Sequence, residues 1–288
     1  MKKIGSTLCL FFLLSASAWS ESPQSSLPWG AIILSGAYTE DDSNLENWDR
    51  ARENLHELLI QQGFEPSNIQ VLTSMPHLIN TLSHGVEMQR ASKANLFEAL
   101  NQAALSNYGG VFLYMTSHGS PNIGFLLESE TEEFYDFLSV GELKEALDTT
   151  LGDKPLIIGI SACYSGQFIH GGVKNWENYE EQGSLKGPNR VLFTAASRSR
   201  SSFGCGSGSL MPEWDDSFIK ALAFKTQYKT WGGLYRAIKL EIDDKEKSYS
   251  KNEKSLPQYW AGSNMKLLDI WSLPQQSEIN LSSILEIF

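Results

Sequence analysis

The chain has 288 residues, of which 41% are hydrophobic, and a formal net charge of −11. This length allows one sizeable hydrophobic core but is short for two full domains. The acidic balance argues against a nucleic-acid partner, and no apolar segment is long enough to predict stable membrane insertion.

The first residues have the pattern of a secretory signal peptide. A basic pair, Lys2-Lys3, precedes an apolar stretch over residues 8–14, and small residues in an A-x-A arrangement follow. We therefore expect residues 1–20 to be removed and residues 21–288 to form one exported domain. The sequence does not distinguish a periplasmic from an extracellular destination, and it indicates no oligomeric state.

Apolar segments alternate with amphipathic ones along the chain. The first helix is expected to begin with a capping box, Ser43 to Glu46, to carry Trp48 on its apolar face and to end at Gly63. A second capping box joins Ser139 and Glu142. Strands are predicted over 29–37, 68–73, 109–120, 154–162 and 189–197, helices over 43–63, 92–105, 139–150, 213–225 and 231–243, a hairpin over 123–137, a solvated polar run over 241–254, and an extended segment near 257–268.

Continuously apolar strands that alternate with helices are typical of a parallel sheet that is buried on both faces. The sequence contains no internal repeat and no Pro- or Ser-rich linker. It therefore predicts a single α/β domain with a mainly parallel central sheet flanked by helices on both faces.

Two of the predicted strands end in residues that can carry nucleophilic chemistry. His118 follows the third strand and Cys163 follows the fourth. Ligands of open parallel sheets bind beyond the carboxyl ends of the strands, so the two side chains would meet if these strands are neighbours. An imidazole can generate a thiolate and later protonate a leaving amine, while the amides of Gly119 and Cys163 could receive an oxyanion.

A structural disulfide is the competing interpretation of the cysteines. Removal of the signal peptide leaves Cys163 and Cys205, and a pair of cysteines in an exported protein usually forms a disulfide. The remaining histidines, His56, His77 and His84, are better explained as surface or helix residues, and His170 as a loop residue. The cysteines and histidines have no zinc-ligand spacing, so neither a metal nor another cofactor is expected.

Three short motifs in a fixed order are more specific. "TSHGS", "SACYSG" and "TAASRSRSSFGC" each follow an apolar strand. This arrangement resembles the legumain-type cysteine peptidases, the C13 family of the caspase-like clan, and especially their bacterial members, from about Trp29 to Leu268. The resemblance implies a caspase-like sandwich and metal-free peptide-bond hydrolysis. By motif position, Cys163 would be the nucleophile, His118 the acid/base and Gly119 an oxyanion amide.

The substrate pocket departs from the pattern of that family. Eukaryotic legumains have an acid two residues before the nucleophile, where this chain has Ser161. The basic residue expected after the first strand has no exact counterpart, and Arg50 is the nearest candidate. Ser197 could add a donor, and Asp215 an acceptor, although the acids of "EWDD" also suit a helix N-terminus. We expect cleavage after Asn or Asp in preference to Lys or Arg.

Two other functions are compatible with these residues. A transamidase or transpeptidase would use the same thioester with an amine as acceptor in place of water. A non-catalytic binding protein could retain the fold, although the presence of both dyad residues argues against it. A peptide or protein is the expected partner in each case. Cys205 closes the "SSFGC" motif and is expected to be structural.

Overall fold

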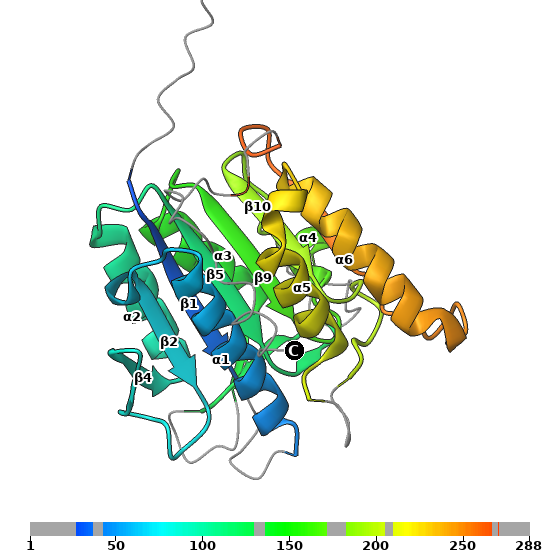
Figure 1. Ribbon diagram of the computed structural model, residues 1–288, viewed down its shortest axis with the longest axis horizontal. Coiled ribbons are helices and arrows are strands. Elements are labelled where there is room, and N and C mark those ends of the chain that lie inside the picture. Colours follow the sequence, from blue (N-terminus) through cyan, green and yellow to red (C-terminus); the bar gives the residue numbers. More distant parts are fainter. Residues whose placement is uncertain are drawn as a thin grey trace, which may run out of the picture.

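The computed structural model describes residues 27–36, 43–129, 136–171, 183–204, 210–266 and 270. Its core is an eight-stranded sheet in the order β11-β10-β9-β5-β1-β2-β4-β3 (Figure 1). The pairs that join β4 through to β10 are parallel, and the two edge strands pair antiparallel. The strands are β1 (Trp29–Ser35), β2 (Ile69–Thr73), β3 (Leu82–Ser83), β4 (Val86–Arg90), β5 (Gly110–Thr116), β9 (Leu156–Ser161), β10 (Arg190–Thr194) and β11 (Gln258–Ala261).

Helices cover both faces of this sheet (Figure 1). Alternate residues of β1 belong to two separate hydrophobic cores, with Ile33 in one and Ile32 in the other. The first core lies under α1 (Leu45–Gln61), α5 (Glu213–Ala223) and α6 (Trp231–Lys245), and the second under α2 (Lys93–Leu105), α3 (Val140–Thr150) and the short α4 (Gln167–His170). Single 3₁₀ turns occupy Pro66–Asn68, Lys225–Gln227 and Glu246–Ser248. The predicted α/β fold is confirmed.

All five predicted parallel strands are present, with ends that differ by a few residues from the expected ones. The capping box between Ser139 and Glu142 is also confirmed, since the Ser139 side chain and the Glu142 side chain each bond the other's backbone N–H. The box at Ser43 was wrong: α1 begins at Leu45, its N-cap is Asn44, and that residue makes no side-chain capping bond. Gly63, with φ of 91°, follows α1 as expected.

A small antiparallel sheet follows β5 directly. Its strands are β6 (Gly119–Ser120), β7 (Gly124–Leu127) and β8 (Asp136–Leu138), in that order. Leu126 N–H donates to the carbonyl of His118 at 3.0 Å, so this sheet holds the backbone of His118 from outside the main sheet. The hairpin predicted over 123–137 is confirmed for its described residues, and residues 130–135 lie outside them.

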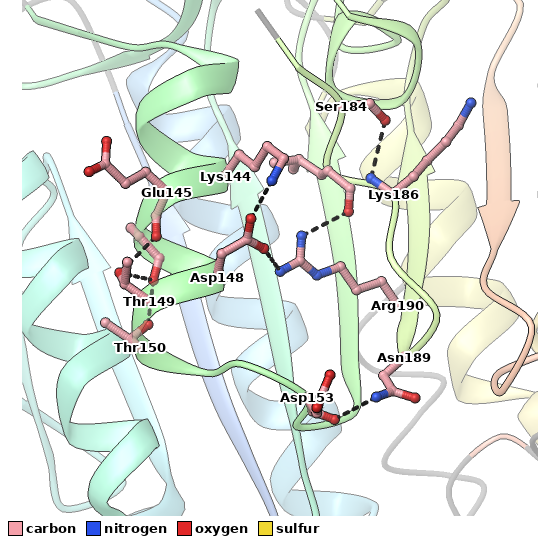
Figure 2. A network of polar contacts seen from close by, with 12 residues as sticks. Lys144, Glu145, Asp148, Thr149, Thr150, Asp153, Ser184, Lys186, Asn189 and Arg190 are labelled. Atoms are coloured by element: carbon pink, nitrogen blue, oxygen red, sulfur yellow. Dashed lines mark hydrogen bonds and ion pairs between the residues drawn. The ribbon is translucent and has the colours of Figure 1, made fainter.

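A polar network ties the chain that enters β10 to the end of α3 (Figure 2). Asp148 pairs with both Lys144 and Arg190. Arg190 also donates to the carbonyl of Leu185 at 3.0 Å, and Asn189 donates to the carbonyl of Asp153 at 2.8 Å. These contacts lie at the amino-terminal end of β10, opposite the strand ends that carry the candidate chemistry, so we assign them a structural role.

No helix within the described ranges has the length and apolar character needed to cross a membrane.

Candidate active site

Strand register places the two candidate catalytic residues side by side. β5 pairs with β9, and Thr116 lies opposite Ser161. His118 and Cys163 each follow two residues later, so they leave the sheet at the same level from neighbouring strands. Residues at matching positions of adjacent strands point to the same side of a sheet. The structure therefore brings these two residues together at the carboxyl edge.

Gly119 contacts the nucleophile segment through its backbone. A Cβ atom built on Gly119 would overlap the carbonyl oxygen of Cys163, and it would lie 3.1 Å from the Cβ of Ala162. Only glycine permits this approach. Among the described residues, the Cys163 N–H donates to no backbone carbonyl, whereas those of Tyr164 and Ser165 both do. The backbone of Gly119 is thus in contact with the backbone of the candidate nucleophile.

The Cys163 thiol is partly exposed and free. Its Sγ accepts a hydrogen bond from Ser202 N–H at 3.3 Å and lies 3.8 Å from the Ser202 carbonyl, to which it can donate. Cys163 is therefore not joined to Cys205 in a disulfide; Cys205 itself lies outside the described residues.

The turn that presents the thiol is held in an unusual backbone conformation. Tyr164 has φ of 58°, and its N–H donates to the carbonyl of Arg200 at 2.7 Å. Gly166 N–H donates to the carbonyl of Ala196 at 2.8 Å, and a Cβ on Gly166 would lie 2.5 Å from the backbone N of Arg198. Left-handed non-glycine residues persist only where surrounding contacts impose them. Here those contacts come from the chain that follows β10.

His118 packs against an aromatic side chain of α1. The ring centroids of His118 and Trp48 are 4.5 Å apart, with an interplanar angle of 80°. Trp48 is 1% exposed and packs with Leu45 and Met75, so its ring has little freedom. An edge-to-face contact of this kind limits rotation of the imidazole about its own side-chain bonds. The apolar pattern of the sequence placed Trp48 on the inner face of the helix but did not predict its contact with His118.

Four hydroxyl side chains form a row beneath this edge. Thr73, Ser35, Thr116 and Ser161 are in register across β2, β1, β5 and β9. Each is at most 3% exposed. Buried hydroxyls need hydrogen-bond partners, and two carboxylates from the helices above them meet this need at opposite ends of the row.

Asp49 of α1 serves one end of the row. It accepts hydrogen bonds from Thr73 at 2.7 Å and Ser35 at 3.1 Å, and Arg52 binds both of its oxygens at 2.8 Å. Burial raises the pKa of Asp49, but the hydrogen bond and charge of Arg52, with the two hydroxyls, outweigh it and hold the pKa below its ordinary value. Asp49 and Arg52 are 5% and 2% exposed, so this is a buried ion pair.

Asp215 of α5 serves the other end without a cation. It accepts from Tyr114 at 2.8 Å and from Ser161 at 2.5 Å, and it is 0% exposed. Burial raises its pKa to about 6, although hydrogen bonds from Ser161, Tyr114 and Thr116 act in the opposite direction. The position of Asp215 near the start of a helix had suggested an ordinary N-terminal acid, but its side chain points inward to the sheet.

The predicted pocket residues are only partly assembled. Ser161, which lies two residues before the nucleophile, donates a hydrogen bond to Asp215. Ser197 is partly exposed after β10, and its N–H donates to Ser255 at 2.8 Å. Arg50 lies on the exposed face of α1, and the arginine that faces inward is Arg52. The helical spacing of residues 48, 52 and 55 could have identified Arg52.

The other histidines lie away from this arrangement. His56 is a buried helix residue, and burial, followed by Arg52 and His84, lowers its pKa to about 4. His77 and His84 are exposed, and exposed His170 lies 3.2 Å from Gln258. Within the described ranges, no group of three or more His, Cys, Asp or Glu side chains could hold a metal ion.

Comparison with known proteins agrees with this geometry. The model of the peptidase C13 family matches residues 106–266, which include both candidate catalytic residues. No curated protein sequence matches the chain. Among solved structures, caspase-1 from Spodoptera frugiperda is similar, with a TM-score of 0.52 and 13% identity over 82% of this chain and 86% of that one. At this identity the likeness establishes a caspase-like fold and nothing further.

Proposed function

Because the chain belongs to the peptidase C13 family of cysteine peptidases, we propose that it is an endopeptidase whose nucleophile is Cys163 and whose acid/base is His118. The observation that carries this proposal is the pairing of β5 with β9, because His118 and Cys163 each follow by two residues the last pair in register, Thr116 and Ser161. The backbone contact of Gly119 with Cys163 supports it, since an oxyanion amide must lie beside the attacking sulfur.

The reaction would proceed through a thioester. His118 takes the thiol proton, and the sulfur of Cys163 attacks the scissile carbonyl carbon. The N–H groups of Gly119 and Cys163 stabilise the oxyanion, and the imidazolium then protonates the leaving amine as the C–N bond breaks. Water, deprotonated by His118, attacks the thioester, and the thiol leaves with its proton restored. In a transpeptidation a substrate amine would take the place of water.

For the residue before the scissile bond, we propose Asn or Asp in preference to Lys or Arg. Both oxygens of Asp215 already accept hydrogen bonds, and its side chain has no exposed surface, so it cannot pair directly with a substrate cation. Its negative charge above about pH 6 would favour a neutral Asn over an Asp carboxylate. Ser161 is buried and its hydroxyl already donates to Asp215, so Ser197, which is partly exposed, is the predicted donor left for a substrate, and Arg50 stays a prediction.

Digestion of a peptide library by the purified protein, with mass spectrometry of the products, tests these statements together. Replacing Cys163 by Ala should reduce the rate by several orders of magnitude, because the covalent route is lost. Iodoacetamide should label Cys163 and abolish activity. Digestion in ¹⁸O-labelled water separates hydrolysis, which incorporates the label, from transfer to an amine. Near-full activity of Cys163→Ala would refute the assignment.

We also propose export, on the pattern of residues 1–20, which lie outside the described residues. N-terminal sequencing of protein recovered outside the cytoplasm should find a start near residue 21. Accumulation of full-length chain inside the cell would contradict the proposal.

A further inference from the structure

A cavity of about 540 Å³ opens next to the candidate nucleophile. We call it the aromatic pocket; one wall is formed by Arg200, Ser201 and Phe203, and the other by Tyr249, Asn252 and Glu253. Tyr164, which also lines it, follows Cys163 directly, and Ser201 and Phe203 flank the residue whose backbone touches the sulfur. A peptide bound with its scissile carbonyl at Cys163 would therefore place a nearby side chain at this pocket.

The apolar surface of the pocket is a pair of aromatic rings. The ring centroids of Phe203 and Tyr249 are 4.8 Å apart, with an interplanar angle of 55°. Phe203 is held in place because its carbonyl accepts Glu213 N–H at 3.0 Å. The faces of aromatic rings are electron-rich and attract cations.

Carboxylates surround this pair of rings. Glu253 is at the pocket, accepts Ser250 N–H at 2.9 Å, and forms no ion pair within the described part of the chain. Glu213 has one buried carboxylate oxygen without a hydrogen-bond partner among the described residues, and Glu246 is 2% exposed. Glu213, followed by burial and Glu246, raises the pKa of the Tyr249 phenol, so the ring stays neutral.

The cations nearby are already engaged. Arg200 lines the pocket, and its guanidinium donates to the backbone carbonyl of Asn252. Lys245 acts electrostatically on Glu213, but its ammonium pairs with Asp216 at 2.6 Å and Glu241 at 3.1 Å. Among the described residues that line the pocket, Glu253 is the one carboxylate, and Arg200, which keeps its charge, is the one cation.

We propose that the aromatic pocket is a second specificity subsite, which binds the Lys or Arg side chain of a substrate residue close to, but distinct from, the residue before the scissile bond. This inference rests on the proposed endopeptidase activity at Cys163. The methylene stem of the cation would pack on Phe203 and Tyr249, and its charged end would face Glu253.

Matched peptides test the proposal. Each peptide has Asn before the scissile bond. In each pair, one peptide carries lysine at a given flanking position and the other carries the neutral Nε-acetyl-lysine there. A separate pair is made for each flanking position. At one position lysine should raise kcat/KM by about threefold to tenfold, the range of a partly exposed cation–π contact with a nearby carboxylate. Glu253→Gln, which keeps the acceptor for Ser250, should reduce this preference, while Asp244→Asn, an exposed acid that does not line the pocket, should leave it unchanged.

Binding of the same peptides to the Cys163→Ala protein separates this inference from the proposed activity. Tighter binding of the lysine peptide, sensitive to Glu253→Gln, supports the subsite even if no peptide is cleaved. Equal affinity and equal cleavage of both peptides would overturn the subsite and leave the peptidase assignment intact. Tighter binding or faster cleavage of the acetyl-lysine peptide would also overturn it, because the charge of Arg200 would then dominate the pocket.

Discussion

Two carboxylates lie buried beneath the same edge of the sheet, and only one of them has a cation. Asp49 shares its charge with Arg52, and its pKa lies below the ordinary value. The side-chain partners of Asp215 among the described residues are hydroxyls, and burial raises its pKa to about 6. Both accept hydrogen bonds from one in-register row of hydroxyls. The comparison shows that hydrogen bonds alone do not compensate the desolvation of a carboxylate here, whereas hydrogen bonds with a guanidinium do.

The largest effect is expected from breaking the ion pair. Asp49→Asn leaves the Arg52 guanidinium buried without a counter-charge, which should lower the free energy of unfolding by about 3–5 kcal/mol. Urea denaturation at neutral pH measures the loss. The double variant Asp49→Asn/Arg52→Met removes both charges and should recover a large part of it. A loss below about 1 kcal/mol in the single variant would show that the pair is solvated.

Asp215→Asn should change how the stability of the protein depends on pH. The carboxyl ionises near 3.8 in the unfolded chain and near 6 in the folded one, so the folded state binds the proton more tightly between these values. The stability of the natural protein therefore falls by about 3 kcal/mol from this group as pH rises through that window. Because Asn does not titrate, the stability of the variant relative to the natural protein should increase by this amount from pH 4 to pH 7. A flat difference would contradict the raised pKa.

Tyr114→Phe should increase the difference between Asp215 and Asp49, because it removes one of the hydroxyl partners of Asp215. The hydrogen bond from Tyr114 lowers the pKa of Asp215, so the variant should titrate at a higher pH than the natural protein. The loss in free energy of unfolding should be about 1.5–3 kcal/mol at pH 8, where the carboxylate is charged, and smaller at pH 5. Equal losses at the two pH values would mean that Asp215 does not change its charge between them, which would contradict a pKa near 6.

The smallest effect is expected from Trp48→Phe. Trp48 precedes Asp49 on α1 and contacts His118, so it lies between the hydroxyl row and the proposed chemistry. Phe keeps an aromatic ring but fills less of the space against His118, so an aromatic contact worth about 0.5–1.5 kcal/mol is weakened. The rate should fall by up to about tenfold, and the pKa of His118, followed by NMR, should move. Trp231→Phe, which changes a buried Trp on α6, should leave that pKa unchanged. An unmoved His118 titration in Trp48→Phe would show that the contact is only packing.

Much of this architecture was predictable because long apolar runs fix the buried strands. β3 and β4 were not predicted because they lie at the sheet edge and alternate buried with exposed residues, as in Val86–Arg90. The Ser43 capping box failed because a four-residue pattern does not reveal where the first helical turn closes. The sequence predicts Asp215 either as a pocket acceptor or as an acid at a helix N-terminus, because its position near a helix start does not indicate which way the helix is rotated. That rotation is set by Trp214 and Phe218, which are buried beside it.

The alignment of His118 with Cys163 comes from backbone pairing. Replacing a side chain in these strands and changing the length of a strand should therefore have different consequences. Replacing side chains along β5 or β9 leaves the register of Thr116 and Ser161 in place. Loss or gain of one residue within either strand would turn one member of the pair toward the opposite face of the sheet. Most side chains of these strands can therefore change while the pairing is kept, whereas a change of strand length cannot be absorbed in the same way; a caspase-like fold is shared here at 13% identity.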